Sequence, residues 1–202
     1  WNGSSWTEVN DLNTGRPSFG GAGATYTAAI AAGGYTSAFK NETETWNGTS
    51  WTEVNNLNTA RSACGLAGTS TASVLAGGES PAGNDAKTEI WNGTAWTESA
   101  NLNLAKREFA TIGSTYTSAL IAGGVSPISG NIDTKVEDWN GASWQETSDI
   151  STGRYQLNAG QSGTTTSGVI FGGKPTYGSP PATTGATEEW SGTSNTIKVL
   201  TD

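Results

Sequence analysis

Tryptophan recurs along this chain at nearly constant intervals, and this spacing constrains the fold more than any other feature. A first tryptophan returns every 45 to 51 residues, at Trp1, Trp46, Trp91, Trp139 and Trp190. In the first four units a second one follows five residues later, at Trp6, Trp51, Trp96 and Trp144. A period of this length predicts a repeat architecture, in which each unit is one supersecondary element that packs on its neighbours.

The tryptophans belong to a longer register of repeated residues, which we interpret as scaffold. A glutamate lies two positions before the first tryptophan, at Glu44, Glu89, Glu137 and Glu188, and another lies two positions after the second, at Glu8, Glu53, Glu98 and Glu146. An apolar residue then precedes an arginine, in the pairs Leu12 and Arg16, Leu57 and Arg61, Leu102 and Arg107, and Ile150 and Arg154. Each unit's apolar run ends in a glycine pair, at 33–34, 77–78, 123–124 and 172–173.

The segments between these markers have the composition of short strands. The runs before the glycine pairs, such as 117–122, are apolar and bounded by glycine, as buried strands are. The segment after each arginine, such as 107–116, is a second strand candidate. The segment around Trp46 predicts a hairpin, because Asn-Gly accepts the positive φ angles of a tight turn. A two-residue turn would place Trp46 opposite Thr49 and a four-residue loop would place it opposite Trp51; the sequence leaves both open.

Each unit therefore offers four strands, and no helical period extends beyond a turn. One four-stranded sheet cannot bury both of its faces, whereas radial stacking of such sheets buries them and hides strand edges. We expect an all-β fold, a single β-propeller of four-stranded antiparallel blades, with about four blades plus a half-blade. The expected boundaries are 1–15 for the half-blade and 16–60, 61–105, 106–153 and 154–202 for the repeats.

The order of these markers resembles the kelch repeat. In that family an apolar run with Gly-Gly is followed by Glu-x-aromatic, then by tryptophan, then by arginine. Kelch units usually carry tyrosine where this chain has Trp46, Trp91 and Trp139, and their turn between the two aromatics is usually longer. The chain is thus similar to a divergent kelch-like repeat, of the kind seen in surface proteins of bacteria and phages. The resemblance covers nearly the whole chain and implies a propeller, usually with more than four blades.

The sequence begins and ends on a tryptophan-hairpin half. Each repeat has two halves: a segment that runs from the arginine to the glycine pair, and a tryptophan hairpin. The sequence contains four of the first kind and five of the second. In the last unit Asn195 replaces the second tryptophan. Three completions of the propeller remain open: missing sequence, another chain, or an unusually small closed ring. We expect missing sequence. The altered last unit fits a terminal strand or a cap.

Composition excludes several classes of partner. Only 34% of the residues are hydrophobic, which is typical of disorder, but the regular tryptophans argue for an ordered β structure. The formal net charge of −8 disfavours nucleic acid and anionic membranes as partners. No apolar stretch approaches the length of a transmembrane helix, so we expect no membrane insertion.

The residue inventory argues against catalysis. The chain contains no histidine, which removes the commonest general base and histidine-dependent triads or metal sites. Its one cysteine, Cys64, lies in a predicted strand, where we expect a small buried apolar residue rather than a reactive thiol. Eight of the twelve glutamates are fixed to the repeat, whereas a catalytic carboxylate pair is a unique constellation. We therefore predict no enzymatic activity, no catalytic residue, no cofactor and no metal site.

The repeated arginines and glutamates predict buried pairs. All four arginines of the chain recur in the same frame, and a guanidinium can bridge backbone carbonyls and a carboxylate at once. We expect these arginines to be at least half buried and to pair with the glutamates before the first tryptophans, as Arg16 with Glu44, Arg61 with Glu89, Arg107 with Glu137 and Arg154 with Glu188.

Binding specificity on such a scaffold is usually carried by loops, and the segment after each glycine pair varies most. Each of these loops holds one lysine. The ligand-binding candidates, for a glycan or an acidic partner, are Tyr35, Phe39, Lys40, Asn84, Asp85, Lys87, Asn131, Asp133, Lys135, Lys174 and Tyr177. Two other interpretations remain open: solvated loop residues that keep the surface soluble, and Ca²⁺ ligation by the asparagine and aspartate oxygens.

The function expected from this sequence is that of a non-enzymatic binding or structural module. Its composition resembles that of virion (phage) and bacterial cell-surface proteins, which implies an attachment protein that recognises a glycan or a protein, outside the cell or on the virion surface. Other chains of a larger assembly are further expected partners. Since fold does not fix function, two alternatives stay open: a carbohydrate-active enzyme that uses loop carboxylates, and an intracellular kelch-type adaptor.

Overall fold

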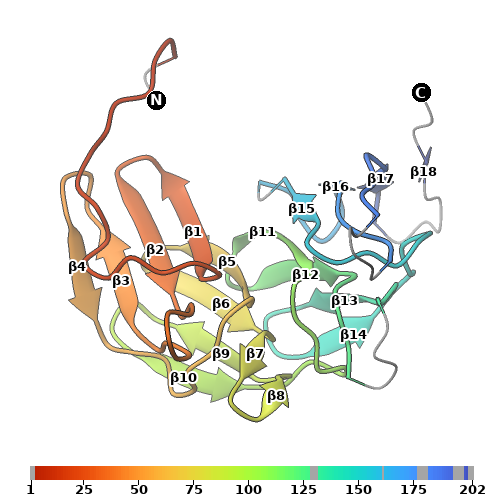
Figure 1. Cartoon of the computed structure of the whole chain (residues 1–202), viewed down its shortest axis with the longest axis horizontal. Helices are drawn as coiled ribbons and strands as arrows, with labels where there is room; N and C mark the ends of the chain where they lie inside the picture. The colour runs from red at the N-terminus through yellow and green to blue at the C-terminus, as the bar shows by residue number, and fades with distance from the viewer. Residues whose placement is uncertain (1–2, 128–131, 161, 177–181, 193–197, 200–202) are drawn as a thin grey trace.

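The computed structural model of the chain is built from β-strands and their connections (Figure 1). It describes residues 3–127, 132–160, 162–176, 182–192 and 198–199, and no helix occurs among them. The strands form four four-stranded antiparallel sheets and one short two-stranded hairpin. The expectation of an all-β chain with four-stranded antiparallel units is confirmed.

The four sheets follow one another along the chain. Sheet 1 comprises β1 (Gly20–Thr25), β2 (Ala28–Ala32), β3 (Thr43–Trp46) and β4 (Trp51–Val54). Sheet 2 comprises β5 (Gly65–Thr69), β6 (Ala72–Ala76), β9 (Thr88–Trp91) and β10 (Trp96–Ser99), with the hairpin of β7 (Glu79–Ser80) and β8 (Gly83–Asn84) between β6 and β9. Sheet 3 comprises β11 (Ala110–Thr115), β12 (Ser118–Ala122), β13 (Val136–Trp139) and β14 (Trp144–Glu146). Sheet 4 comprises β15 (Asn158–Ala159), β16 (Gly168–Phe171), β17 (Thr187–Trp190) and β18 (Lys198–Val199).

The hairpin that carries each tryptophan pair closes with a four-residue loop. Trp46 lies opposite Trp51 in the register of β3 and β4, and their ring centroids are 5.6 Å apart. The side-chain oxygen of Asn47 accepts hydrogen bonds from the backbone N–H groups of Thr49 and Ser50, both at 2.9 Å. The glycine after the asparagine takes a φ of +93°. This local geometry, which an Asn-Gly pair favours, decides which residues face each other in the hairpin.

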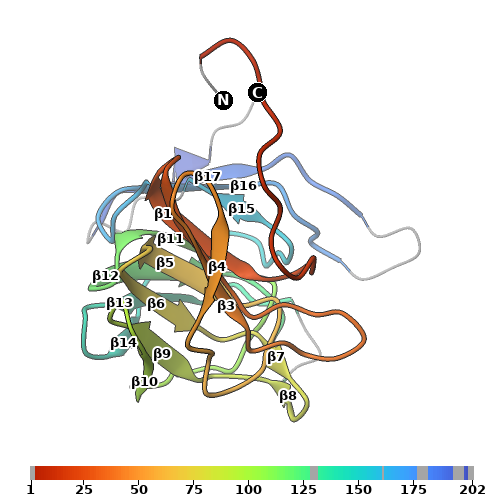
Figure 2. The same ribbon diagram turned by 90° about the vertical axis from the view of Figure 1, so that its left-hand side faces the viewer.

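The sheets stack in chain order, each packed on the next (Figures 1 and 2). Contacts between sheets join β1 to β5, β5 to β11 and β11 to β15, so the first strands stand side by side. Apolar clusters fill the spaces between the sheets, with Trp91 and Trp96 between sheets 1 and 2 and Trp139 and Trp144 between sheets 2 and 3. The main strand contacts include none between sheets 1 and 4 among the described residues, so the stack is an open arc.

A row of unusual backbone conformations crosses the stack where the first strands begin. Four non-glycine residues with φ between 51° and 59° occupy equivalent positions, namely Ser18, Ala63, Glu108 and Gln156. Each of the last three donates its backbone N–H to the carbonyl of the one before it, at 2.7, 3.2 and 2.8 Å along the row. A positive φ is costly for residues with a Cβ. These hydrogen bonds between sheets compensate for that cost. They also fix the position of each sheet relative to the previous one.

The contact between sheets 3 and 4 lacks an aromatic ring that is present in the contact between sheets 1 and 2 and in the contact between sheets 2 and 3. At those two, an indole N–H donates to a threonine hydroxyl of the previous sheet, from Trp96 to Thr43 at 3.0 Å and from Trp144 to Thr88 at 2.9 Å. In the last unit the sequence has asparagine at this tryptophan position, outside the described residues, and sheet 3 has Val136 at the position of the threonine. An apolar pocket lies between the two sheets, lined in part by Ile112, Leu120, Val136, Ile150, Ile170 and Trp190.

Candidate binding face and the buried network beneath it

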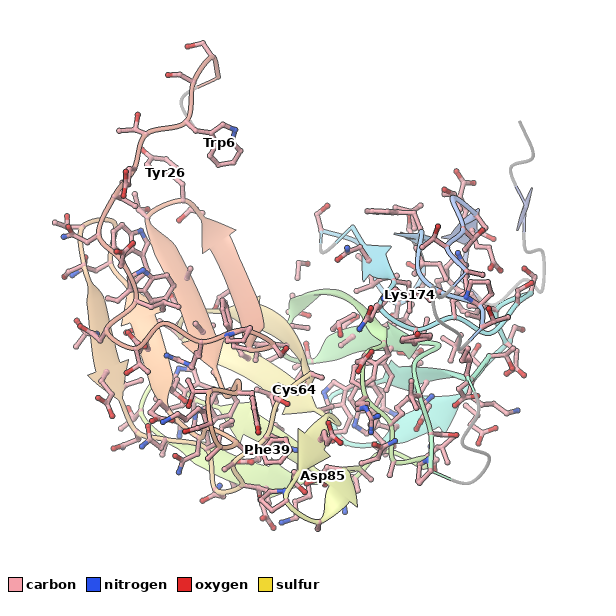
Figure 3. All side chains as sticks on the ribbon, in the orientation of Figure 1. Trp6, Tyr26, Phe39, Cys64, Asp85 and Lys174 are labelled. Atoms are coloured by element: carbon pink, nitrogen blue, oxygen red, sulfur yellow. The ribbon has the colours of Figure 1, made fainter. Side chains whose placement is uncertain are left out.

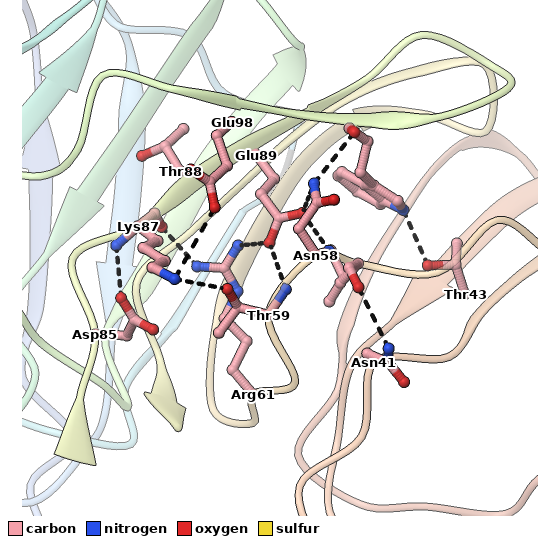
Figure 4. Close-up of polar contacts among 12 residues, drawn as sticks. Asn41, Thr43, Asn58, Thr59, Arg61, Asp85, Lys87, Thr88, Glu89 and Glu98 are labelled. Atoms are coloured by element: carbon pink, nitrogen blue, oxygen red, sulfur yellow. Dashed lines mark hydrogen bonds and ion pairs between the residues drawn. The ribbon is translucent and has the colours of Figure 1, made fainter. Parts of the chain in front are cut away.

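A buried carboxylate organises the base of each variable loop, as sheet 2 illustrates (Figure 4). Arg61 Nη2 donates to Glu89 Oε1 at 2.6 Å, and both side chains are fully buried. The other oxygen, Oε2, accepts from the backbone N and from Nδ2 of Asn58, at 2.8 and 2.9 Å. Arg61 Nη1 donates to the carbonyl of Lys87 at 2.7 Å. The network therefore joins the segment that links sheets 1 and 2 to β9 and to the end of the loop before it.

The same pairing recurs in two other units. Arg16 and Glu44 form a buried ion pair in sheet 1, and Arg154 and Glu188 form one in sheet 4. Each carboxylate also accepts backbone N–H groups from the segment that precedes the arginine. Three of the four expected arginine–glutamate pairs are thus present, and these three arginines are buried.

The expected pairing of Arg107 with Glu137 is wrong. Lys106 occupies the buried position instead: its side chain is fully buried, and its Nζ lies 3.7 Å from Glu137 Oε1 and 3.4 Å from Asp133 Oδ2. Arg107, whose side chain is 28% exposed, forms an ion pair with Glu79 Oε1 at 3.1 Å. The buried position is set by its distance from the preceding apolar residue of the repeat: Lys106 is the fourth residue after Leu102, just as each of the three buried arginines is the fourth residue after its own apolar residue.

The carboxylate of Glu44 should make the fold sensitive to acid. Burial tends to raise the pKa of Glu44, but hydrogen bonds from Arg16 and Asn13 outweigh it and hold the pKa below its usual value of 4.5. A lowered folded-state pKa contributes stability that is complete above the unfolded-state value and is lost as the pH falls through the folded-state value. We expect the free energy of unfolding in urea to fall below about pH 4.5.

The matched variant for this prediction is Glu44→Gln, which keeps the shape of the side chain and removes its titration. It should be less stable than the parent at neutral pH and should lose less stability between pH 7 and pH 3. The same loss in parent and variant would show that other groups cause the acid sensitivity.

The four variable loops leave the sheets at one common edge, because each follows the glycine pair at the end of a second strand. In the first three loops the second glycine donates its N–H to the carbonyl of the next sheet's buried cation, as Gly34 does to Arg61 at 2.9 Å. The base of each of these loops is therefore held by the neighbouring sheet. Figure 3 labels Phe39, Asp85 and Lys174, which come from three of the four loops.

A groove of about 450 Å³ lies on this edge beside the β7–β8 hairpin, and we call it the Lys87 groove. Its lining comes from the segment between sheets 1 and 2 and from the loop of sheet 2: Asn58, Thr59, Ala60, Ser80, Pro81, Ala82, Asn84, Asp85 and Lys87. Lys87 Nζ donates to Thr59 Oγ1 at 2.9 Å and thereby connects the two segments. Asp85 Oδ1 accepts from the backbone N of Lys87 at 2.8 Å. An ammonium, a carboxylate and a hydroxyl therefore stand beside the apolar surface of Pro81.

Asn84 has a different role from its two neighbours in the groove. Its Nδ2 donates to the carbonyl of Val125 at 2.8 Å, and its Oδ1 accepts from Arg107 Nη1. Both ends of the amide are thus used to tie the loop of sheet 2 to sheet 3. Asn84 shapes the groove, whereas Asp85 and Lys87 retain the charge that a ligand can meet.

The remaining binding candidates contact their own surroundings rather than one shared site. Lys40 lies 3.1 Å from Glu42, and Lys135 lies 3.4 Å from Asp149, whose carboxylate raises the pKa of that lysine. Lys174 Nζ lies 5.7 Å from the ring centroid of Tyr155. Tyr35 and Phe39 pack edge to face with centroids 5.2 Å apart, and Asp133 faces the buried lysine of sheet 3. Asn131 and Tyr177 lie outside the described residues.

Cys64 and the acidic residues do not form a further site in the described ranges. Cys64 is partly exposed by surface area, yet burial of its thiol raises its pKa, so the thiolate that would react is disfavoured. No group of three or more cysteine, aspartate and glutamate side chains in these ranges is placed to hold a metal ion. None of the described segments forms a helix that is both long and apolar enough to cross a membrane.

Comparisons with known proteins add no relative to this picture. No protein-family model matches the chain, and no curated protein matches it significantly.

Proposed function

We propose that the chain is a non-enzymatic binding module built as a kelch-like β-propeller, and that it serves for attachment on a virion or a bacterial cell surface. Four stacked four-stranded sheets with their first strands side by side support the propeller interpretation. The loops at one edge are the recognition surface, and a glycan or a protein is the ligand class.

The Lys87 groove is the observation that carries this proposal. Three of the binding candidates, Asn84, Asp85 and Lys87, line this common recess. Its ammonium and carboxylate can donate to and accept from sugar hydroxyls, and an apolar wall beside them suits the C–H face of a sugar ring. A mixed polar and apolar lining on a rigid scaffold favours recognition over chemistry.

The carboxylates near the loops favour the same interpretation. Asp133 faces the buried ammonium of Lys106, and Asp85 accepts the backbone N–H of Lys87. Glu79 pairs with Arg107. These groups hold loops in place, whereas glycoside hydrolysis requires two carboxylates that face each other across an open substrate site.

A glycan array probed with the chain, followed by titration of the best glycan, tests the proposal. Lys87→Ala and Asp85→Ala should each weaken binding by about tenfold or more, the effect of losing one charge-assisted hydrogen bond. Thr94→Ala is the matched control, because the tight turn that holds Thr94 lies at the opposite end of β9 from Lys87. It should bind as the parent does.

Two results would contradict the proposal. Equal binding by the parent and both groove variants would remove the groove from recognition. Turnover of any polysaccharide by the parent chain would favour the carbohydrate-active enzyme.

A further inference from the structure

We propose that the buried side chains of Lys106 and Asp133 join in an amide bond, which the folded chain forms on its own and only once. The proposal concerns a modification of the chain itself and does not depend on what the loops bind. It starts from the departure of sheet 3 from the repeat, where Lys106 stands at the buried position that an arginine occupies in the other three sheets. A lysine amine can lose a proton and act as a nucleophile, whereas the guanidinium of arginine cannot be deprotonated in a protein.

An aspartate accompanies this lysine in sheet 3. Asp133 lies four residues before Glu137, the glutamate of the buried network. In the other sheets the same position holds Lys40, Asp85 and Thr184. Figure 4 shows the arrangement of sheet 2, in which Asp85 accompanies an arginine, Arg61. Sheet 3 is therefore the sheet in which the repeat brings a buried primary amine and an aspartate together.

The contact between the amine and the aspartate is close and shielded from water. Lys106 is fully buried, the side chain of Asp133 is 10% exposed, and Nζ lies 3.4 Å from Asp133 Oδ2. The other carboxylate oxygen, Oδ1, accepts a hydrogen bond from the backbone N of Lys135 at 3.0 Å. Oδ2 is buried as well, but it accepts no hydrogen bond among the described residues. Such an oxygen is costly to bury, and its departure as water removes that cost.

The neighbours of the amine hold it in place and supply a carrier for protons. Lys106 Nζ donates to the carbonyl of Lys135 at 3.2 Å and lies 3.7 Å from Glu137 Oε1. The carboxylate of Glu137 is fixed, because its Oε2 accepts from the backbone N and from Nδ2 of Asn103, at 2.7 and 2.9 Å. Glu137 can therefore carry a proton without moving, while Asp133 supplies the carbon that reacts. Two groups that are held in contact in this way react without a prior encounter in solution.

Bond formation is a condensation that needs no other reactant. One proton moves from the ammonium of Lys106 to Oδ2 of Asp133, and the loss of both charges suits a site without water. Nζ then attacks Cγ of the resulting carboxylic acid. Glu137 accepts the proton that the nitrogen gives up and passes it to the departing oxygen. The Cγ–Oδ2 bond breaks, one water leaves, and the nitrogen and the carbon remain joined as an amide, with no change in oxidation state.

The amide bond gives sheet 3 a connection that the other sheets make through ion pairs and hydrogen bonds. It closes a ring of chain from residue 106 to residue 133, and this ring contains β11 and β12. The segment between sheets 2 and 3 thus stays attached to the loop of sheet 3 when the fold opens. A covalent ring also restricts the unfolded chain, as a disulfide does.

Intact-mass spectrometry of the denatured chain tests the proposal. The parent should weigh one water less than its sequence requires. Lys106→Arg restores the residue that the other three sheets carry, so this variant should keep the fold and have its full mass. Glu137→Gln keeps the shape of the side chain but removes the proton carrier, so most chains of this variant should also keep their full mass.

Digestion with trypsin locates the bond. It should yield one branched peptide, in which residues 88–107 and 108–135 are joined through Lys106 and Asp133. Lys135→Arg is the matched control, since Lys135 Nζ also lies 3.4 Å from a carboxylate oxygen, that of Asp149, but its side chain is 41% exposed. The control should lose one water, as the parent does.

The proposal fails on any of three results. A parent that is folded by tryptophan fluorescence and has its full mass would show that the two groups remain an ion pair. A loss of water that persists in Lys106→Arg would show a different modification, such as cyclisation of an aspartate with its own backbone. A branched peptide that joins other residues would place the bond elsewhere. If Lys106→Arg does not fold, Asp133→Ala, which removes the carbon that reacts, should have its full mass and decides in its place.

Discussion

Glu89→Ala is expected to lower the free energy of unfolding by about 3–5 kcal/mol, the usual cost of removing one partner from a buried ion pair. The substitution leaves the guanidinium of Arg61 buried without its carboxylate. It also removes the acceptor for two hydrogen bonds from Asn58. Urea unfolding followed by tryptophan fluorescence measures the loss. An additional result is expected: the segment that links sheets 1 and 2 should become more susceptible to proteolysis, because Glu89 holds it.

Glu98→Ala is the matched control for this variant. Glu98 lies on the neighbouring strand β10, its side chain is 61% exposed, and it is 3.9 Å from Lys87. An exposed pair of this kind contributes little, so the control should stay close to the parent in stability. If the two variants lose similar amounts, the buried network does not hold the fold together in the way described above.

Trp139→Ala is expected to cost about 3–5 kcal/mol, as large-to-small changes of buried aromatic residues do. Trp139 is fully buried between sheets 2 and 3, and its indole N–H donates to the carbonyl of Tyr116 at 2.9 Å. Its ring packs on that of Trp144 with the centroids 5.2 Å apart. The variant should therefore unfold at markedly lower temperature, which differential scanning calorimetry measures.

This second prediction also decides between two roles for the repeated tryptophans. If they form scaffold, Trp139→Ala weakens the fold, and any loss of binding is restored at temperatures where the variant is folded. If they form an aromatic binding surface, the variant stays stable and loses its ligand. Tyr26→Ala, which removes an exposed ring, controls for the loss of aromatic surface as such.

The strands and the buried pairs could be predicted because they depend on local and repeated signals. Glu, Trp and Arg recur in each unit, and this recurrence indicated that the arginines pair with the glutamates. The number of residues between the two members of a pair nevertheless differs between units. The register of the Trp46–Trp51 hairpin could not be predicted, since Asn-Gly fits two turn lengths and only the side-chain bonds of Asn47 decide between them. The pairing of Lys106 with Glu137 was not predicted, because we matched the arginines by residue type and not by distance from the preceding apolar residue.

The candidate site was only partly predictable, for a different reason. The lysines and polar loop residues could be identified by their departure from the repeat. Their surroundings could not, because the Lys87 groove is completed by residues 58–60, which precede the loop by some twenty residues and reach it through the packing of two sheets. Asn84, predicted as a ligand-binding residue, lines the groove, and its amide also connects two sheets, which the sequence did not indicate.

The row that joins Ser18, Ala63, Glu108 and Gln156 has a consequence for how such a chain folds and varies. Every link in it connects a sheet only to the one before, so the cooperativity of unfolding must pass from neighbour to neighbour rather than through a central nucleus. Each of these contacts joins residues that are one repeat unit apart in the chain. The entropic cost of loop closure is therefore nearly the same for every sheet. After duplication or deletion of a unit, each sheet can still make the same contacts with the sheet before it. The number of units can therefore change without a different hydrophobic core.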